Sequence, residues 1–239
     1  MKLGIMQPYF FPYLGHFSLI AHTDRWVVFD VTQYTPKSWM SRNRVLHPQS
    51  GWNYVNLPLS NSSISILTRE ARVQSMEKSR TSILGKLTHY RRKAPFYQQV
   101  TGLVSDVFSS AGDDSLVRLN TRGLAAVCRY LELPFEYSIC SELALDPQVP
   151  DHPGAWAPAI SRQLGADTYI NPMGGRALFD SKEFSLHSVE LQFLEFSEFR
   201  YDTAPYVYEP GLSILDVLMW NPPQTVREAL FRNARIIEA

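Results

Sequence analysis

The segment Trp26–Val31 constrains the fold more than any other part of the chain. Its residues, WVVFDV, are aromatic or β-branched up to Asp30, which is typical of a strand buried on both faces. A short apolar run, Lys2–Gln7, precedes it and ends at a proline. Between the two, apolar residues at helical spacing after Pro12 predict a helix that ends near Asp24. Strand, helix and strand within about thirty residues indicate a βαβ unit, which favours a parallel sheet.

The rest of the chain continues to alternate between helical and strand-like patterns. The spacing of apolar residues predicts helices over about 76–131. Further strands are expected at Phe135–Cys140, Asp167–Ile170 and Val189–Phe196, with a helix over Ala157–Leu164 between the first two. We therefore expect an α/β fold with a mainly parallel, Rossmann-like central sheet and a helical insertion.

Smaller features are also predicted. A hairpin is expected from Tyr54–Leu59 and Ser63–Leu67, joined by a turn at Asn61–Ser63. Near the end of the chain, one helix is expected to open at Pro210 and another at Pro222–Pro223, because proline fits the first turn of a helix.

Composition excludes several classes of protein. The chain has 239 residues, of which 45% are hydrophobic, so it can build a sizeable core. Its 23 basic and 23 acidic residues cancel, which argues against a nucleic-acid binder, since such proteins carry a basic excess. No apolar run is long enough to span a membrane and no signal peptide is recognisable, so we expect a soluble, cytoplasmic protein.

The two cysteines indicate neither a disulfide framework nor a zinc site. Cys128 falls on the apolar face of an expected helix, where an inert buried thiol is the natural interpretation. Cys140 ends an expected strand and would need a histidine within reach to act as a nucleophile. We expect no metal and no cofactor, because zinc-hydrolase, serine-esterase, Gly-rich dinucleotide and P-loop motifs are absent.

Charge is balanced overall but not locally. Residues 69–93 hold eight basic against two acidic residues, and residues 180–216 hold eight acidic against two basic ones. The simpler interpretation is two solvated faces, or one face packed on the other. The alternative is a cationic wall that attracts an anionic substrate.

The loop after the first strand, in the stretch MQPYFFPYLGHFSLI, is the most distinctive part of the sequence. In an open α/β sheet the carboxyl ends of the strands are where ligands bind, so Gln7 and Tyr9 are candidate binding residues. His16, at the start of the expected helix, is a candidate for anion binding or proton transfer. The alternative is a half-buried structural histidine.

Asp30 is the second candidate for catalysis. A carboxylate at the end of an apolar strand is costly to bury unless it is paired. Lys37, Arg42 and His16 are available partners if the following loop folds back over the sheet edge, and we expect them around one shared cleft. The alternative is a structural salt bridge that locks the loop. Aromatic walls for this cleft are expected from Tyr34 and Trp39.

Two other segments allow both a structural and a functional interpretation. The NPMGG sequence at Asn171–Gly175 follows a strand and is either an ordinary turn or a backbone site for an anion. Asp216 interrupts an otherwise apolar segment, and we expect it to cap a helix or to pair with a basic loop.

The Gly15-His16 dipeptide and the Leu19-Ile20 pair resemble the second half of the signature of nucleotidyltransferases related to class I aminoacyl-tRNA synthetases. In those enzymes the glycine and histidine open the first helix and contact the phosphates of ATP. The start of this chain is therefore nucleotidyltransferase-like. The first histidine or threonine of that signature is absent here, as is a convincing basic KMSKS-like loop.

A closer resemblance, which runs along nearly the whole chain, is to the WbqC-like proteins. It departs from the usual family pattern at Met6, His16 and Ser41. Because the matching pattern is unbroken, we treat residues 1–239 as one domain. The matching residues are Gln7-Pro8-Tyr9, Phe11-Pro12, Gly15, Phe17, Leu19-Ile20, Asp30–Tyr34, Lys37, Trp39, Arg42-Asn43, Ala94–Phe96, Gly165–Tyr169, Phe179-Asp180, Phe184 and Pro210–Leu218.

The resemblance implies a transferase of surface-polysaccharide (O-antigen) or natural-product biosynthesis. We expect it to move an acyl or aminoacyl group onto an amine of a sugar nucleotide or a similar acceptor, with His16 or Asp30 as base. The donor would be a small molecule, possibly a carrier-protein or CoA thioester. An ATP-dependent nucleotidyltransferase and a non-catalytic binding or assembly protein are the alternatives. Substrate-binding residues are expected to be Gln7, Tyr9, Gln33, Tyr34, Lys37, Trp39, Arg42 and Asn43.

Overall fold

A computed structural model describes residues 1–110, 112–145 and 150–239 of the chain. Its central sheet has six strands in the order β5-β2-β1-β6-β7-β8, and every neighbouring pair is parallel except β7 and β8. The expected α/β fold with a mainly parallel sheet is therefore confirmed. The strands are β1 (Lys2–Met6), β2 (Arg25–Val28), β5 (Tyr137–Ile139), β6 (Thr168–Pro172), β7 (Glu190–Phe196) and β8 (Ala234–Glu238).

The order of the strands changes direction at β1. From β1 the chain first builds outward through β2 and β5, and it later returns to build β6 and β7 on the other side of β1. Loops that leave the carboxyl ends of β1 and β6 therefore diverge, and such a point in an open sheet forms a crevice for ligands.

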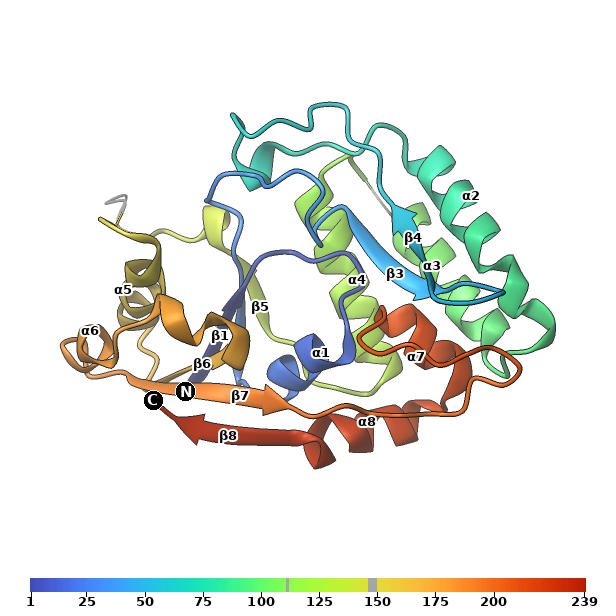
Figure 1. The fold of residues 1–239 in the computed structure, drawn as a ribbon. Helices are drawn as coiled ribbons and strands as arrows, with labels where there is room; N and C mark the ends of the chain where they lie inside the picture. Colours follow the sequence, from blue (N-terminus) through green and yellow to red (C-terminus); the bar gives the residue numbers. More distant parts are fainter. Residues whose placement is uncertain (111, 146–149) are drawn as a thin grey trace.

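Helices cover both faces of the sheet, as Figure 1 shows. Alternate residues of β2 face opposite ways: Trp26 and Val28 join the larger hydrophobic core, and Val27 joins the smaller one. The larger core is shared with α1 (Leu14–Ala21), α7 (Ile214–Trp220) and α8 (Pro223–Arg232). The smaller core is shared with α5 (Trp156–Gln163) and α6 (Ser181–Ser185).

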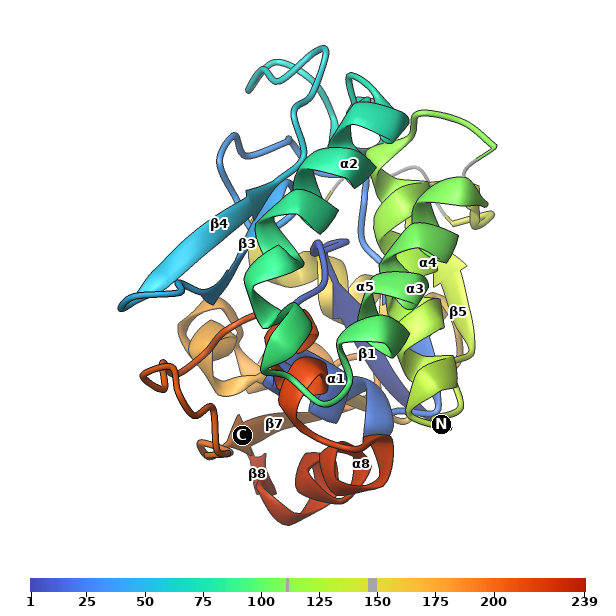
Figure 2. The same cartoon turned by 90° about the vertical axis from the view of Figure 1, so that its right-hand side faces the viewer.

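The expected helical region forms beside the sheet, apart from residue 111, which lies outside the described residues. Its helices α2, α3 and α4 pack side by side (Figure 2), each burying an apolar stripe in the larger core. Serine hydroxyls accept from the backbone at two of the helix starts, at Ser75 and Ser115. The bounds are α2 (Met76–Leu87), α3 (Tyr97–Ser109) and α4 (Leu116–Tyr130).

Short 3-10 turns connect several of these elements. They are η1 (Thr68–Glu70), η2 (Thr88–Arg92), η3 (Cys140–Glu142), η4 (Pro153–Ala155) and η5 (Met173–Leu178). Two of them, η3 and η5, directly follow strands β5 and β6 at the carboxyl edge of the sheet. They therefore help to form the walls around the candidate site described below.

The predicted hairpin is wrong in position. The structure pairs β3 (Arg42–Leu46) with β4 (Trp52–Asn56), whereas residues 63–67 form no strand. The two charged residues of β3 are compatible with a strand because aromatic rings cover them: the Arg42 guanidinium lies 4.4 Å from the centre of the Tyr54 ring. The turn contains Gly51 at a φ of +71°, which glycine adopts without strain.

The ends of two other segments also differ from prediction. Strand β2 stops at Val28, so Asp30 belongs to the loop that follows. The sequence does not predict β8, which pairs with β7 in the antiparallel direction. Its residues are all half-buried or exposed, which is typical of an edge strand, and so short a segment carries little apolar signal.

Candidate functional site

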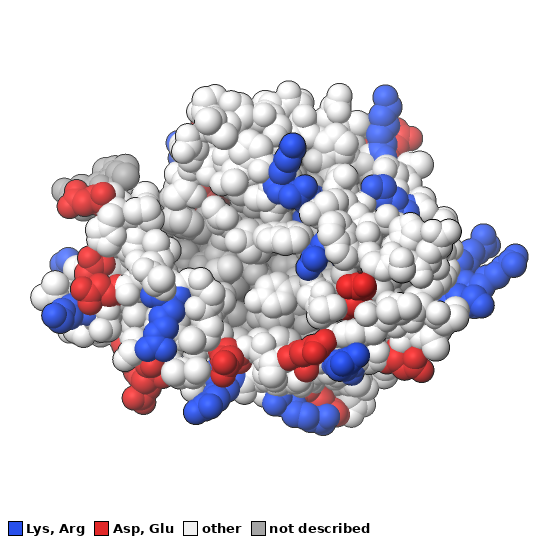
Figure 3. Space-filling view, in the orientation of Figure 1, with Lys and Arg blue, Asp and Glu red and all other residues white. Residues whose placement is uncertain are grey.

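The carboxyl ends of β1, β2 and β6 surround a pocket of about 420 Å³, which we name the switch pocket. It lies where the strand order changes direction. Figure 3 shows a broad hollow on this face, beside the part of the molecule that carries α5, with a floor of uncharged residues. The described lining residues, none of them charged, are Ile5, Met6, Gln7, Tyr9, Phe29, Thr32, Gln33, Thr35, Pro153, Trp156, Ala157, Tyr169, Asn171, Leu178 and Phe179.

Aromatic rings form much of the wall of the switch pocket. Phe29, just after β2, meets the indole of Trp156 at the start of α5, with ring centroids 5.5 Å apart. Tyr169 of β6 packs edge to face on Phe179, with centroids 5.6 Å apart. Polar atoms come from the amides of Gln7, Gln33 and Asn171. Flat apolar faces with a few amides and hydroxyls match an uncharged polar ring better than a phosphate.

Asn171 is held in a fixed orientation at the end of β6. Its Oδ1 accepts a 2.8 Å hydrogen bond from the Tyr169 hydroxyl, and its Nδ2 donates to the Pro172 carbonyl at 2.8 Å. Burial raises the pKa of Tyr169, so the phenol keeps its proton and remains a donor. A Cβ atom on Gly175 would collide with this amide, so a larger residue there would displace it. The NPMGG segment thus belongs to β6 and the turn η5 that closes one side of the pocket.

Side chains of other elements donate hydrogen bonds to the backbone carbonyls of the loop between β1 and α1. Asn120 of α4 donates to the Pro8 carbonyl at 2.6 Å. Asn43 donates from Nδ2 to the Phe11 carbonyl at 2.9 Å and to the preceding carbonyl at 3.0 Å, and Ser213 donates to Phe11 at 2.7 Å. Asn43 is 3% exposed. The structure therefore places Asn43, a predicted substrate-binding residue, in buried contact with the loop that carries Gln7 and Tyr9.

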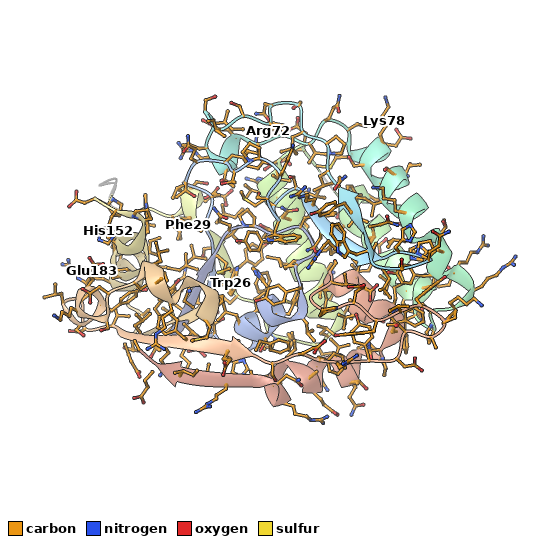
Figure 4. The ribbon with its side chains drawn as sticks, in the orientation of Figure 1. Trp26, Phe29, Arg72, Lys78, His152 and Glu183 are labelled. Atoms are coloured by element: carbon orange, nitrogen blue, oxygen red, sulfur yellow. The ribbon has the colours of Figure 1, made fainter. Side chains whose placement is uncertain are left out.

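A hydrogen bond between His152 and Glu183 joins two segments beside the switch pocket. His152 precedes η4, and its Nε2 lies 2.8 Å from the carboxylate of Glu183 in α6. Figure 4 shows these two side chains next to each other on the far side of the pocket from Trp26, with Phe29 between. The pair joins the segment that carries Trp156 to the one that follows Phe179.

Asp30 faces a different hollow, the charged pocket, on the other side of the β2 carboxyl end. The Ser141 hydroxyl and backbone N–H both donate to its carboxylate, at 2.6 and 2.9 Å. Burial raises the pKa of Asp30 in spite of these bonds and of nearby Arg69. The pocket has a volume of about 450 Å³, and its described lining residues are Asp30, Arg69, Glu70, Arg72, Asp113, Asp114, Ser115, Val117, Arg118, Ile139, Ser141 and Glu142.

Most cations of the charged pocket already have anionic partners. Arg118 lies 2.8 Å from Glu142 and 3.6 Å from Asp113, and Arg72 lies 3.4 Å from Asp114. Such exposed pairs stabilise the fold little. They leave the pocket with mixed charge, so it has no clear preference for an anion or a cation.

Lys37 and Arg42 line a third hollow, of about 330 Å³, together with Tyr34. The Tyr34 hydroxyl donates to Ser41 at 3.0 Å and is buried, so Tyr34 presents little surface to a ligand. Lys37 has a φ of +57°, an uncommon conformation for a residue with a side chain. This hollow adjoins the switch pocket through the segment 33–35, whose other two residues line that pocket.

His16 is enclosed by aromatic rings. Its imidazole lies 5.1 Å from the ring of Trp26 and 5.6 Å from that of Tyr9. The side chain is 1% exposed, and neither ring nitrogen has a hydrogen-bond partner among the described residues. Burial lowers the pKa of His16 to about 3, so the imidazole is neutral at physiological pH. The ring of Tyr9 lies between this imidazole and the switch pocket.

The single ion-rich cleft that the sequence predicts does not form. Asp30 lines the charged pocket, Lys37 and Arg42 line the third hollow, and His16, a residue of α1, is buried against Trp26. The reason is that β2 ends at Val28, so the segment 29–35 runs along the sheet edge. Its side chains line different hollows: Asp30 lines the charged pocket, Tyr34 the third hollow, and Phe29 the switch pocket. Trp39 is 41% exposed and lies beside the Arg44 guanidinium, 5.5 Å from its ring centre.

Three predicted binding residues do come together in the switch pocket. They are Gln7, Tyr9 and Gln33, and the Gln33 amide donates to the Ile64 carbonyl. Sequence reasoning missed the residues that β6 and α5 contribute. The available signal was the end of the strand Asp167–Ile170, because ligands bind at the carboxyl ends of parallel strands and Asn171 is the next residue. The sequence carries no comparable signal for Trp156.

The two cysteine thiols are not activated as nucleophiles. Cys128 and Cys140 are both free and buried. Burial raises the pKa of each thiol to about 12, and for Cys140 the Asp30 carboxylate adds to this effect. Neither thiol is therefore ionised at neutral pH.

In the described parts of the chain, no cluster of three or more His, Cys, Asp or Glu side chains is placed to hold a metal ion. Nor does any described helix combine the length and apolar character needed to cross a bilayer.

The fold and the switch pocket define an α/β protein with a pocket at the carboxyl edge of a mainly parallel sheet. The chain belongs to the WbqC-like protein family, whose model matches residues 7–228. It is similar to "Uncharacterized protein Rv1507c" of Mycobacterium tuberculosis, with 25% identity over 221 residues that cover 91% of this chain and 92% of that protein. No solved structure matches the chain.

Proposed function

We propose that the protein is a biosynthetic transferase that binds an uncharged sugar ring in the switch pocket and transfers an acyl or aminoacyl group to an amine of that sugar. The sugar would be part of a sugar nucleotide or a similar acceptor. The observation that carries the proposal is the composition of the pocket: aromatic rings, amides and hydroxyls, without a charged side chain among the described lining residues. Membership of the WbqC-like family is consistent with a biosynthetic role.

The neighbouring hollows supply the remaining groups of this proposal. Lys37 and Arg42 would hold the anionic part of the donor or acceptor, because their hollow adjoins the switch pocket through the segment 33–35. Asp30 is the favoured base, since its raised pKa makes it a better proton acceptor than an ordinary aspartate. Its carboxylate lines the charged pocket, so the acceptor would have to extend from the switch pocket past Phe29 to bring its amine to Asp30. His16, the other candidate base, has a lowered pKa and is enclosed by rings.

The proposed reaction forms one bond and breaks one. The amine nitrogen of the acceptor bonds to the carbonyl carbon of the donor, while the bond from that carbon to the donor's sulfur or oxygen breaks. The base removes a proton from the amine, and the leaving group receives a proton in turn.

The test is binding followed by product detection. Nucleotide-linked amino sugars should raise the melting temperature, because a ligand that binds the folded state stabilises it. Gln7→Ala should reduce this shift, whereas Gln49→Ala, the same change in the exposed β3–β4 turn, should not. With an acyl thioester added, mass spectrometry should detect an amide product with the wild type and not with Asp30→Asn.

The contrary outcome is equally definite. A shift with ATP and magnesium, release of pyrophosphate and no response to amino sugars would replace the proposal with the nucleotidyltransferase alternative. That alternative expects an imidazole in contact with phosphate, and His16 is buried away from solvent.

A further inference from the structure

A further pocket is lined mainly by aromatic rings and apolar residues. It lies where β7 ends and the chain approaches α7, and its volume is about 330 Å³. We name it the tyrosine pocket. Its aromatic lining residues are Tyr13, Phe196, Phe199, Tyr201 and Tyr208.

The rings come from two distant parts of the chain. Tyr13 belongs to the loop before α1, and its ring packs over Gly15, where a Cβ atom would collide with it. On the other wall, Tyr201 meets Tyr208 edge to face with centroids 5.3 Å apart, and Phe199 lies 5.7 Å from Tyr201. A ligand between these walls would contact several ring faces at once.

The one charged residue among the described lining residues is an acid, Glu198. It lies beside the Tyr208 phenol, and together with burial it raises the pKa of that phenol to about 12. Figure 3 shows acidic and basic side chains interleaved along the lower part of the face it displays. Glu198 is therefore the group that attracts a cation within this pocket.

One ring of the pocket already has a cation against it. The guanidinium of Arg200, an exposed residue, lies 5.0 Å from the centre of the Tyr208 ring. Tyr201 donates its hydroxyl hydrogen to the Asp216 carboxylate at 2.7 Å, which shifts electron density toward its ring. Electron-rich ring faces beside a carboxylate are the arrangement that binds an organic ammonium ion.

We infer that the tyrosine pocket binds a ligand through an alkylated ammonium group, held by the faces of Tyr13, Tyr201 and Tyr208 and neutralised by Glu198. A primary ammonium would need three acceptors for its N–H groups. Glu198 supplies the one carboxylate among the described lining residues, and most of the remaining lining is ring faces and apolar groups, which suit N-methyl groups better than N–H groups. An ammonium whose hydrogens are replaced by methyl groups needs only ring faces and a nearby negative charge. The inference is independent of the proposed transferase activity.

The test compares two probes of one shape. Choline carries a trimethylammonium group, and 3,3-dimethylbutan-1-ol has the same shape without the charge. We expect titration by saturation-transfer NMR to show choline binding to the full chain at least about fivefold more tightly than the alcohol. Equal or tighter binding of the alcohol would make this an ordinary apolar pocket, and the absence of saturable choline binding would also overturn the inference.

Matched variants locate the binding. Tyr13→Leu should weaken choline binding by about threefold or more, whereas Tyr137→Leu should leave it unchanged. Both tyrosines are exposed to a similar extent, 41% and 43%, so both variants should fold. Glu198→Gln should weaken choline and not the alcohol, and Glu195→Gln, on the exposed part of β7, serves as its control. If Tyr13→Leu and Glu198→Gln leave choline binding intact, the assignment is wrong.

Discussion

Asp30 and Asp216 are both carboxylates buried in this fold, but the protein holds them in different ways. Asp216 is fully buried and accepts hydrogen bonds from the Tyr90 hydroxyl, the Tyr201 hydroxyl and the Leu46 backbone N–H. Asp30 is 1% exposed, accepts from Ser141 alone among the described residues, and lines the charged pocket. Burial raises the pKa of both.

The partners show what each carboxylate does. Those of Asp216 come from β3, from η2 and from the segment after β7, so one side chain joins three separate parts of the chain to α7. The Asp30 carboxylate joins the loop after β2 to η3 alone and keeps lone pairs for a ligand. Burial of a carboxylate therefore does not mark a functional site by itself. A carboxylate with few donors that borders a pocket is the better candidate.

Among the variants that test the difference between Asp30 and Asp216, we expect Asp216→Ala to have the largest effect on stability. Removal of the carboxylate leaves the Tyr90 and Tyr201 phenols without their acceptor, while the Leu46 N–H keeps its 2.9 Å bond to the Tyr90 oxygen. Each buried donor left unpaired costs about 1–3 kcal/mol, so the free energy of unfolding should fall by about 2 kcal/mol or more. Urea denaturation measures this value. A loss below about 1 kcal/mol would show that the network does not hold the three segments together.

A smaller effect is expected on the pH dependence of stability. Because the pKa of Asp216 is raised in the folded state, the folded protein binds this proton more tightly than the unfolded chain does. The stability contributed by Asp216 is therefore fully present below the unfolded pKa and is lost as the pH rises through the raised folded value. Asp216→Asn removes this titration. We expect the stability difference between wild type and Asp216→Asn to be largest near pH 4 and to shrink toward neutral pH, as measured by urea denaturation at each pH.

Asp30 titrates in both of these proteins, so its contribution cancels in the difference. A stability difference that grows with pH would mean that Asp216 is held as a charged carboxylate with a lowered pKa. That result would assign the larger electrostatic role to the three donors rather than to burial.

The contrast between the two carboxylates also shows how far the sequence could predict this protein. The βαβ start and the parallel strands were predictable because buried strands and amphipathic helices leave a clear apolar pattern, as in Trp26–Val28. The hairpin was misplaced because β3 carries Arg42 and Arg44, and the rings that cover these cations lie on other segments.

The candidate site was predictable only in part, for a related reason. Gln7, Tyr9 and Gln33 follow strands β1 and β2 directly, so local sequence places them at the sheet edge. Trp156 reaches the same pocket from α5, and no local pattern shows that contact. Asp216 was expected to cap a helix or to pair with a basic loop. Ser213 caps α7 instead, and the partners of Asp216 are two phenols and a backbone N–H from distant segments.

We expect Asp30→Asn to have the smallest effect on stability. This variant best separates a structural role of Asp30 from a chemical one. An asparagine at position 30 can still accept from the Ser141 N–H through its oxygen and can donate from its nitrogen to the Ser141 hydroxyl. It also removes the cost of burying a charge. We expect the free energy of unfolding to change by about 1 kcal/mol or less, while formation of the proposed amide product is lost.

Urea denaturation and the product assay on one preparation of Asp30→Asn separate the two roles. A loss of stability as large as that of Asp216→Ala would place Asp30 with the structural carboxylates and remove the base from the proposed reaction. Unchanged stability with unchanged product formation would leave the fold account intact and require a different base. Unchanged stability with lost product formation would show that the two equally buried carboxylates have different roles, Asp216 a structural one and Asp30 a chemical one. The number of hydrogen-bond donors around each carboxylate would then distinguish the two roles.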